Sequence, residues 1–229
     1  FCLIGWLDAD RSTPANITVD ILFNRIGGDL TLQGANIGST ASGFAQIGHH
    51  PFSSSTEPSI LNGNISLVVD GSISLVGGSA SEASTARIGH SGDIESFTRT
   101  GQVSAIAGKN IVMQSNTGSA NITNAGGDIT LVTNIGSIQL DNATIFCGGP
   151  GVLRVNSQQD CSLLSSREQS VCTMTVMSGI ADFTIGRDLT VASTGADSFS
   201  GIGIVTSNPT GGSLQFTVGR NVSLLTDNS

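Results

Sequence analysis

The chain has 229 residues, a formal net charge of −8, 30 Gly, one Trp, no Tyr and only 11% charged residues. Its nine Lys and Arg form no basic stripe, which argues against nucleic-acid binding, and no apolar run approaches the twenty residues of a membrane-spanning helix. Turn-forming and β-branched residues dominate, so we expect a nearly all-β protein that does not insert into a membrane.

Residues 1–26 fit no regular pattern. The chain begins at Phe1, without a signal-peptide pattern, and we expect a single β-solenoid domain spanning 1–229 that is cut from a longer precursor. Residues 50–61 contain two prolines and a run of serines, which predicts a loop that leaves the regular structure.

A five-residue phrase that begins with glycine recurs along the chain. Copies occur at 28–32 (Gly-Asp-Leu-Thr-Leu), 63–67, 71–75, 127–131, 136–140, 212–216 and, one residue longer, at 186–191 and 219–224. Apolar and polar residues alternate in each copy, as in a strand with one buried face, and we expect the glycine to supply the corner through a positive φ. A short strand and a tight corner in repetition predict a parallel β-helix of nine to twelve coils with about 19–25 residues each. The alternative fold is an antiparallel β-sandwich.

The same alternation predicts which side chains face the core of the β-helix. The expected inward residues are Leu30, Leu32, Ile65, Leu67, Ile73, Leu75, Ile111, Ile129, Leu131, Ile138, Leu140, Leu189, Val191, Leu214, Phe216, Val222 and Leu224.

A longer phrase, Ala-x-Ile-Gly-His, occurs at 45–49 and again at 86–90. That spacing suits two coils of about twenty residues, which would place His49 and His90 two strand spacings apart, at roughly 10 Å. Two histidines at that distance do not share a metal ion. We therefore expect no metal site, and a hydrogen bond from each histidine to the backbone of its turn.

Residues 142–177 interrupt the glycine repeat and hold three of the four cysteines, at 147, 161 and 172. We expect a loop or hairpin here that leaves the solenoid, with the charged residues Arg167 and Glu168 at its tip as a candidate contact loop. Cys161 and Cys172 close the shortest loop, so a disulfide is one interpretation. Buried thiols that act as small hydrophobic side chains are the other.

No constellation of residues predicts catalysis. Four aspartates stand at the same place in the phrase, where a strand begins: Asp29, Asp93, Asp128 and Asp188. This placement indicates that they stabilise the corners through hydrogen bonds to their own backbone. Glycoside hydrolysis needs a facing pair of carboxylates, and no off-repeat cluster supplies one. We find no nucleophile elbow and no phosphate-binding glycine loop. We therefore expect no enzyme and no cofactor, with a polysaccharide-degrading β-helix enzyme as the alternative.

The phrases Gly-Gly-Asp-Leu-Thr-Leu at 27–32, Gly-Gly-Asp-Ile-Thr-Leu at 126–131 and Ala-Gln-Ile-Gly-His at 45–49 resemble large secreted bacterial adhesins of the filamentous haemagglutinin type and related autotransporter passengers. This resemblance implies a right-handed parallel β-helix that is secreted or held at the bacterial cell surface, outside the outer membrane. It also implies that loops contact a host surface protein or glycan. A pure spacer without a ligand is the competing hypothesis.

Overall fold

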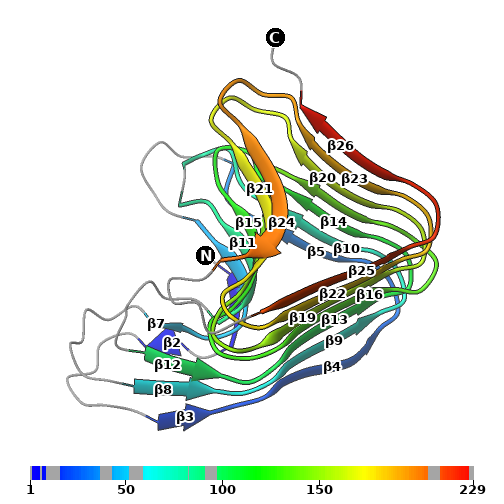
Figure 1. Cartoon of the computed structure of the whole chain (residues 1–229). Coiled ribbons are helices and arrows are strands. Elements are labelled where there is room, and N and C mark those ends of the chain that lie inside the picture. Colours follow the sequence, from blue (N-terminus) through cyan, green and yellow to red (C-terminus); the bar gives the residue numbers. More distant parts are fainter. Residues whose placement is uncertain are drawn as a thin grey trace.

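A computed structural model describes residues 2–5, 7–8, 16–36, 43–51, 59–81, 83–90, 97–205 and 212–226. Every regular element in these residues is a β-strand, and they include no helix long and apolar enough to cross a membrane. Three seven-stranded sheets form the sides of a triangle around the core (Figure 1). Every pairing within them is parallel, which shows a right-handed parallel β-helix and excludes the antiparallel sandwich.

Each full coil passes through the three sheets in the same order, and the described part of the last coil has strands of sheets I and II alone. Sheet I contains β4 (Ile21–Ile26), β9 (Ile65–Val69), β13 (Val103–Ala107), β16 (Ile129–Thr133), β19 (Val152–Ser157), β22 (Ile180–Ile185) and β25 (Ser213–Val218). Sheet II contains β5 (Leu30–Gln33), β10 (Ile73–Val76), β14 (Ile111–Gln114), β17 (Ile138–Asp141), β20 (Cys161–Ser165), β23 (Leu189–Ser193) and β26 (Val222–Thr226). Sheet III contains β1 (Cys2–Ile4), β6 (Ala45–Ile47), β11 (Ala86–Gly89), β15 (Ala120–Asn124), β18 (Thr144–Cys147), β21 (Val171–Val176) and β24 (Phe199–Ile204). Coils 1 to 7 are numbered here by their sheet I strands.

Two small parallel sheets widen the N-terminal coils. They consist of β3 (Asn16–Thr18), β8 (Ser59–Asn62) and β12 (Phe97–Thr100), and of β2 (Leu7–Asp8) paired with β7 (His50–Pro51). The larger of them lies beside the start of sheet I (Figure 1). The predicted loop at 50–61 therefore includes residues of β7 and β8, and its middle, 52–58, lies outside the described residues.

The coils are fewer and longer than the sequence predicted. Sheet I has seven strands, so the described residues form seven coils. Residues that are hydrogen-bonded across neighbouring coils are 44 positions apart in coil 1, 24 in coil 4 and 33 in coil 6. The expectation of nine to twelve coils is therefore wrong, and the expected length of about 19–25 residues holds in coil 4 but not in coils 1 and 6. Coils 1 to 6 hold three main strands each, and no coil spans more than two copies of the five-residue phrase. The small sheets lengthen the first two coils.

Residues 142–177 do not leave the solenoid, which corrects the prediction of an extra-helical loop. They contain β18, β19, β20 and β21, each paired in parallel with strands of the coils before and after. The glycine signal lapses here because Asn142 and Gln169, both with φ 53°, take the left-handed conformation at two corners. Cysteines also replace aliphatic residues at inward positions, which hides the alternation.

The predicted inward residues form the core along most of its length. Most of them are buried, and Leu30 and Val191 are half-buried and pack against the core. The prediction fails in coil 7, where Leu214, Phe216, Val222 and Leu224 are 39%, 42%, 58% and 74% exposed. These four are in register with inward residues of coil 6, but no described strand covers them from the other side.

Close stacking of coils accounts for much of the glycine repeat. Gly127 does not have a positive φ, contrary to the prediction, but a Cβ on it would lie 1.8 Å from the carbonyl oxygen of Gly101. Gly89, in the second Ala-x-Ile-Gly-His phrase, combines φ 127° with a Cβ position 1.8 Å from the carbonyl oxygen of Thr123. Any side chain at either position would therefore force neighbouring coils apart.

Candidate functional site

The corner between sheets I and II is held by side chains that cap the next coil. Asp29 Oδ1 accepts a hydrogen bond of 2.7 Å from the backbone N–H of Ser72, and Asn110 Oδ1 accepts one of 2.9 Å from that of Ser137. Further along, the side chain of Asp160 accepts a hydrogen bond from the backbone N–H of Asp188. The side chain of Asp188 in turn accepts one from the backbone N–H of Asn221, and both bonds measure 3.2 Å. At the corner that opens sheet I, Asp128 accepts from Val152 N at 2.9 Å. The predicted role of these aspartates in stabilising the corners is thus confirmed, but their side chains bond to the following coil and not to their own turn. Asp93 lies outside the described residues.

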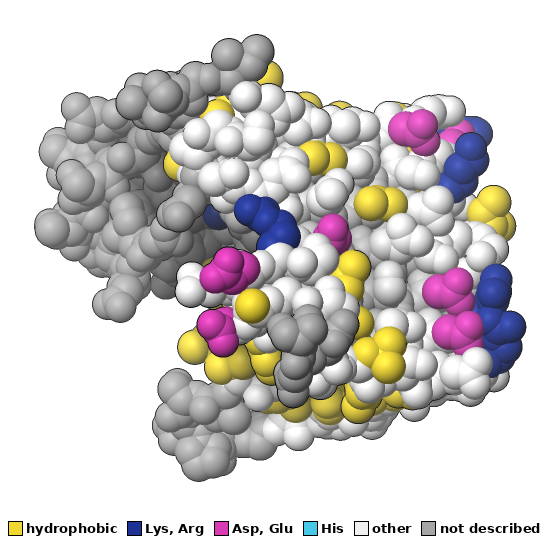
Figure 2. All heavy atoms as spheres, turned by 90° about the horizontal axis from the view of Figure 1, so that it is seen from above, with side chains coloured by type: hydrophobic (Ala, Val, Ile, Leu, Met, Phe, Trp, Pro, Cys, Tyr) yellow, Lys and Arg dark blue, Asp and Glu magenta, His cyan; other side chains and the backbone are white. Residues whose placement is uncertain are grey.

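Ion pairs neutralise several of the same aspartates. Arg154 lies 3.5 Å from Asp128, Arg187 lies 3.6 Å from Asp160, and Arg220 lies 2.5 Å from Asp188. Figure 2 shows acidic and basic side chains next to one another along its right-hand edge, over the corner between sheets I and II. Burial alone would raise the pKa of Asp188, but hydrogen bonds from Arg220 and Asn221 outweigh it and hold that pKa below its ordinary value. These carboxylates therefore contribute to the fold, as caps of the next coil and as partners of arginines.

The two histidines of the repeated phrase lie one coil apart and not two. Their rings stack with centroids 4.8 Å apart, so the predicted separation of two strand spacings is wrong. His49 Nε2 lies 2.9 Å from the carbonyl oxygen of Val19, and His90 Nε2 lies 2.9 Å from that of Gly63. A carbonyl accepts only, so each Nε2 carries a proton. The histidines therefore bond to backbone as predicted, but each acceptor lies about thirty positions earlier in the chain and not in the histidine's own turn. The described residues contain no group of three or more His, Cys, Asp or Glu that could hold a metal ion.

All four cysteines are unbonded in the structure. Cys161 on β20 and Cys172 on β21 are fully buried thiols, so the structure does not join the pair that the sequence suggested as a disulfide. Burial raises the pKa of Cys161 to about 12 and those of Cys172 and Cys147 to about 11. The interpretation as small hydrophobic side chains describes them best.

A polar groove lies where coil 4 turns from sheet II to sheet III. The corner of coil 4 consists of residues 142–143, whereas the corners of coils 3 and 5 take five residues each, at 115–119 and 166–170. A short corner between two long ones leaves a hollow of about 350 Å³. The hollow, called here the corner groove, is lined by Ser115, Asn116, Thr117, Gly118, Ser119, Asn142, Thr144, Arg167, Glu168, Gln169, Ser170 and Val171.

Arg167 spans the corner groove from coil 5 to coil 3. Its Nη1 donates a hydrogen bond of 3.2 Å to the carbonyl oxygen of Ser115 and another to that of Asn116. Glu168, the next residue in the turn, is exposed at the same rim. The two predicted contact residues therefore lie together on the surface, on a tight turn of the solenoid and not at the tip of a projecting loop.

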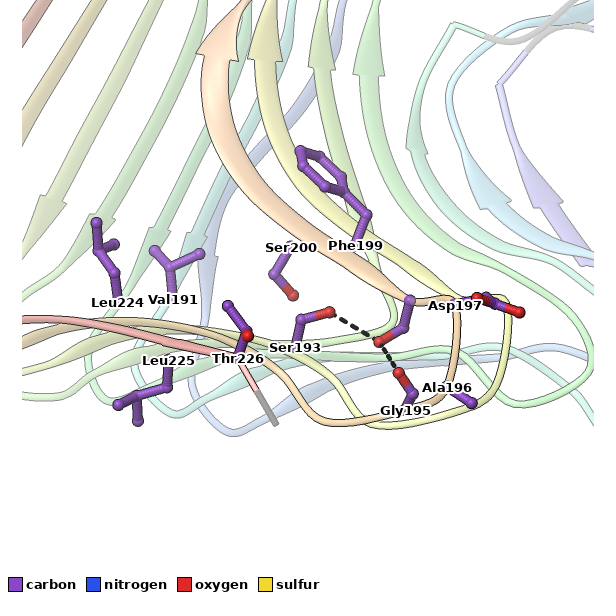
Figure 3. Close-up of a pocket in the computed structure, with 11 residues that line it drawn as sticks. Val191, Ser193, Gly195, Ala196, Asp197, Phe199, Ser200, Leu224, Leu225 and Thr226 are labelled. Atoms are coloured by element: carbon purple, nitrogen blue, oxygen red, sulfur yellow. Dashed lines mark hydrogen bonds between the residues drawn. The ribbon is translucent and has the colours of Figure 1, made fainter. Parts of the chain in front are cut away.

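The turn that carries Arg167 and Glu168 is repeated in coil 6 without the charges. In the first turn, Ser170 Oγ donates to the carbonyl oxygen of Arg167 at 2.5 Å and lies 2.8 Å from Ser165 Oγ. In the second, Ser198 Oγ donates to Gly195 O at 2.6 Å and lies 2.7 Å from Ser193 Oγ, as the dashed lines in Figure 3 show. The fourth residue of each five-residue turn is left-handed, with φ 53° at 169 and 52° at 197. Gly195 and Ala196 thus occupy the places of Arg167 and Glu168.

Sequence reasoning missed the coil 3 side of the corner groove. Residues 115–119 carry no charge and no distinctive spacing, so nothing in the sequence marks them as neighbours of Arg167, which lies about fifty residues away. The detectable signal is the difference in corner length between successive coils. Using it requires the register of the strands, which the sequence alone did not supply.

Comparison with known proteins supplies no relative. No protein-family model, no curated protein and no solved structure matches this chain.

Proposed function

We propose that the chain is an exported, non-enzymatic segment of a bacterial surface protein. In this proposal the β-helix is a stiff stalk, and the Arg167–Glu168 turn with the corner groove contacts a host surface protein or glycan. The surface location rests on the resemblance of the repeated phrases to filamentous-haemagglutinin-type adhesins. The solenoid architecture agrees with such a role, because a stack of coils makes an extended surface on which corners carry recognition.

The observation that carries the proposal is the contrast between the two equivalent turns. Residues 194–198 form the turn with Gly195 and Ala196, so the backbone does not require Arg167 or Glu168 at the same places in coil 5. The turn therefore does not need the charged pair, which stands at the rim of a hollow, although Arg167 also bonds to the backbone of coil 3. Charged side chains that the turn does not need are candidates for recognition.

The non-enzymatic part of the proposal is supported by the corner carboxylates. Asp128, Asp160 and Asp188 each cap a backbone N–H of the next coil and each pair with an arginine. A carboxylate held in this way is not free to act as a general acid opposite a second carboxylate.

The test is a binding measurement with one turn exchanged for the other. The double variant Arg167→Gly with Glu168→Ala gives the coil 5 turn the two residues of the coil 6 turn and leaves the net charge unchanged. The whole chain and this variant are applied to cultured epithelial cells and to immobilised matrix proteins. We expect the whole chain to bind and the variant to lose about tenfold in affinity, the size of a lost pair of charge-assisted contacts.

The matched control removes one cation and one anion elsewhere. Arg25→Ala with Asp70→Ala deletes an exposed ion pair of 2.7 Å in the N-terminal coils, again without a change in net charge. This control should bind like the whole chain. Equal binding by the whole chain and the turn variant would remove the turn from the proposal, and no binding by any of the three proteins would favour a pure spacer.

A further inference from the structure

We propose that the corner groove binds a neutral oligosaccharide, and that the exposed ring of Phe199 forms the platform at its open end. This inference rests on the proposed function and names the class of ligand for the same site. Three observations carry it: the hydrogen-bonding groups of the walls, their balance of charge, and the position of the Phe199 ring.

The walls of the groove present hydrogen-bonding groups that the fold does not use. Thr117, Thr144 and Gln169 line the groove, and no hydrogen bond in the described part of the chain engages their side chains. Thr117 and Gln169 are exposed, and Thr144 is half-buried. Hydroxyl and amide groups both donate and accept, as sugar hydroxyls also do. A ligand rich in hydroxyl groups can form hydrogen bonds with these side chains.

The charge of the groove argues for a neutral ligand. Its lining contains one cation, Arg167, and one anion, Glu168, and Arg167 already donates two hydrogen bonds to backbone carbonyls. The chain as a whole has a net charge of −8, which disfavours an approaching polyanion. Sulfated and acidic glycans therefore fit the groove less well than neutral ones.

An aromatic ring lies one strand beyond the apolar end of the groove. Val171 lines the groove, is 51% exposed and is in register with Phe199, which is 59% exposed. A Cβ on Gly201 would lie 2.7 Å from Phe199 Cζ, so the ring covers this glycine. Figure 3 shows the ring beside β24; Phe199 lines a separate hollow there, together with Val191 and Leu224, and lies outside the lining of the corner groove itself. The ring thus lies over the sheet where a side chain is missing and is exposed to solvent. Such a surface accepts the apolar face of a sugar ring, next to walls that bind its hydroxyls.

The dimensions agree with one short oligosaccharide. The groove has a volume of about 350 Å³, near the lower end of the roughly 300–1,000 Å³ of small-ligand sites. Phe199 is one strand spacing of about 4.8 Å from Val171. A ligand of two or three sugar rings would reach from Thr144 to Phe199.

The experiment screens the whole chain against immobilised neutral oligosaccharides that end in glucose, galactose, mannose or N-acetylglucosamine, with a heparin-derived oligosaccharide as the charged probe. The best neutral probe is then titrated by calorimetry against two variants. Thr144→Val removes one hydroxyl without changing shape, and Phe199→Leu keeps an apolar side chain but removes the ring. Each should weaken binding about five- to tenfold. The control Thr130→Val removes a hydroxyl from the outer face of sheet I and should bind normally, and thermal melting checks that all three variants fold.

Two results would overturn the inference: binding of no neutral probe, or neutral binding that neither variant weakens. Binding of heparin alone would overturn it as well. The cell-binding measurement of the proposed function is run in parallel, with and without an excess of the best neutral probe. If cell binding persists although no neutral probe binds, the oligosaccharide proposal is contradicted and the proposed surface-contact function is retained. If the chain binds a neutral glycan but not cells, the oligosaccharide site in the groove is supported and the proposed contact with host cells is contradicted.

Discussion

His49 stacks on His90 with ring centroids 4.8 Å apart and an interplanar angle of 9°, although 41 positions separate them in the sequence. The distance between the ring centroids equals one strand spacing, so the two histidines lie in neighbouring coils. The backbone N–H of His49 also donates to His90 Nδ1 at 3.3 Å, and Gln46 Nε2 donates to the carbonyl oxygens of His49 and Gly89. The stack ties the first two coils together where the chain leaves sheet III.

Replacing His90 with alanine should destabilise the fold by about 3 kcal/mol. His90 is 2% exposed, and its loss leaves the carbonyl oxygen of Gly63 and the N–H of His49 without their ring partners. Urea denaturation followed by circular dichroism measures the change. Gln139→Ala, at an exposed strand position, is the control and should stay within about 0.5 kcal/mol of the wild type. Equal midpoints for both variants would contradict a structural role for the stack.

The corner caps can be tested one at a time. Asn110→Ala removes the oxygen that accepts from Ser137 N at 2.9 Å and should cost about 1 kcal/mol, as a lost cap does at a helix end. Asn134→Ala is the control, because Asn134 is exposed at another corner and its side chain makes no hydrogen bond within the described residues. Chemical denaturation of the two variants should separate them. Indistinguishable stabilities would mean that the caps contribute nothing.

Stability should fall as pH rises above 9. Burial raises the pKa of Cys161 to about 12 and that of Cys172 to about 11, from an ordinary value of 9.0. Unfolded thiols therefore lose their protons first, unfolding releases protons, and the free energy of unfolding declines from pH 9 to about 12. Cys161→Ala should flatten this decline, whereas Cys2→Ala, at an exposed position, should not. A disulfide between Cys161 and Cys172 in the isolated protein would remove the contribution of these two thiols, leave that of Cys147, and contradict the assignment of the pair as thiols.

A charge in the core should be costly. Leu131 is fully buried, and Leu131→Asp would place a carboxylate among aliphatic side chains with no cation, at a cost of about 4 kcal/mol or more. Thr130→Asp is the control, because Thr130 faces outward in register with Arg154. The control should keep its melting temperature, and the core variant should unfold tens of degrees lower or fail to fold. Similar behaviour of the two would mean that the inward and outward faces are wrongly assigned.

The sequence predicted the fold wherever local pattern decides the structure. Residues 127–131 alternate cleanly, and their strand, its inward face and its parallel pairing all appear as expected. The pattern fails at 142–177, because Cys161 and Cys172 take core positions and the left-handed corner residues are Asn142 and Gln169 instead of glycines. Whether a cysteine serves as a core residue depends on its neighbours in other coils. That information is not local in the chain.

The candidate site was predicted in part. Arg167 and Glu168 stand out as charges in a chain poor in charge, so composition alone singled them out. The wall at Thr117 and the platform at Phe199 depend on register and on a difference in corner length, both of which are set by packing over whole coils. The length of the coil itself was misjudged for the same reason.

The central claim is that one uninterrupted β-helix carries the contact turn at a tight corner and not on a projecting loop. Amide hydrogen exchange resolved along the chain tests this claim most directly, because protection reports hydrogen bonds between coils. We predict that amides of β18, β19, β20 and β21 exchange as slowly as those of β13 and β16, with faster exchange confined to corners such as 166–170. Exchange across 144–176 at the rate of an unstructured chain, while β13 and β16 stay protected, would contradict it.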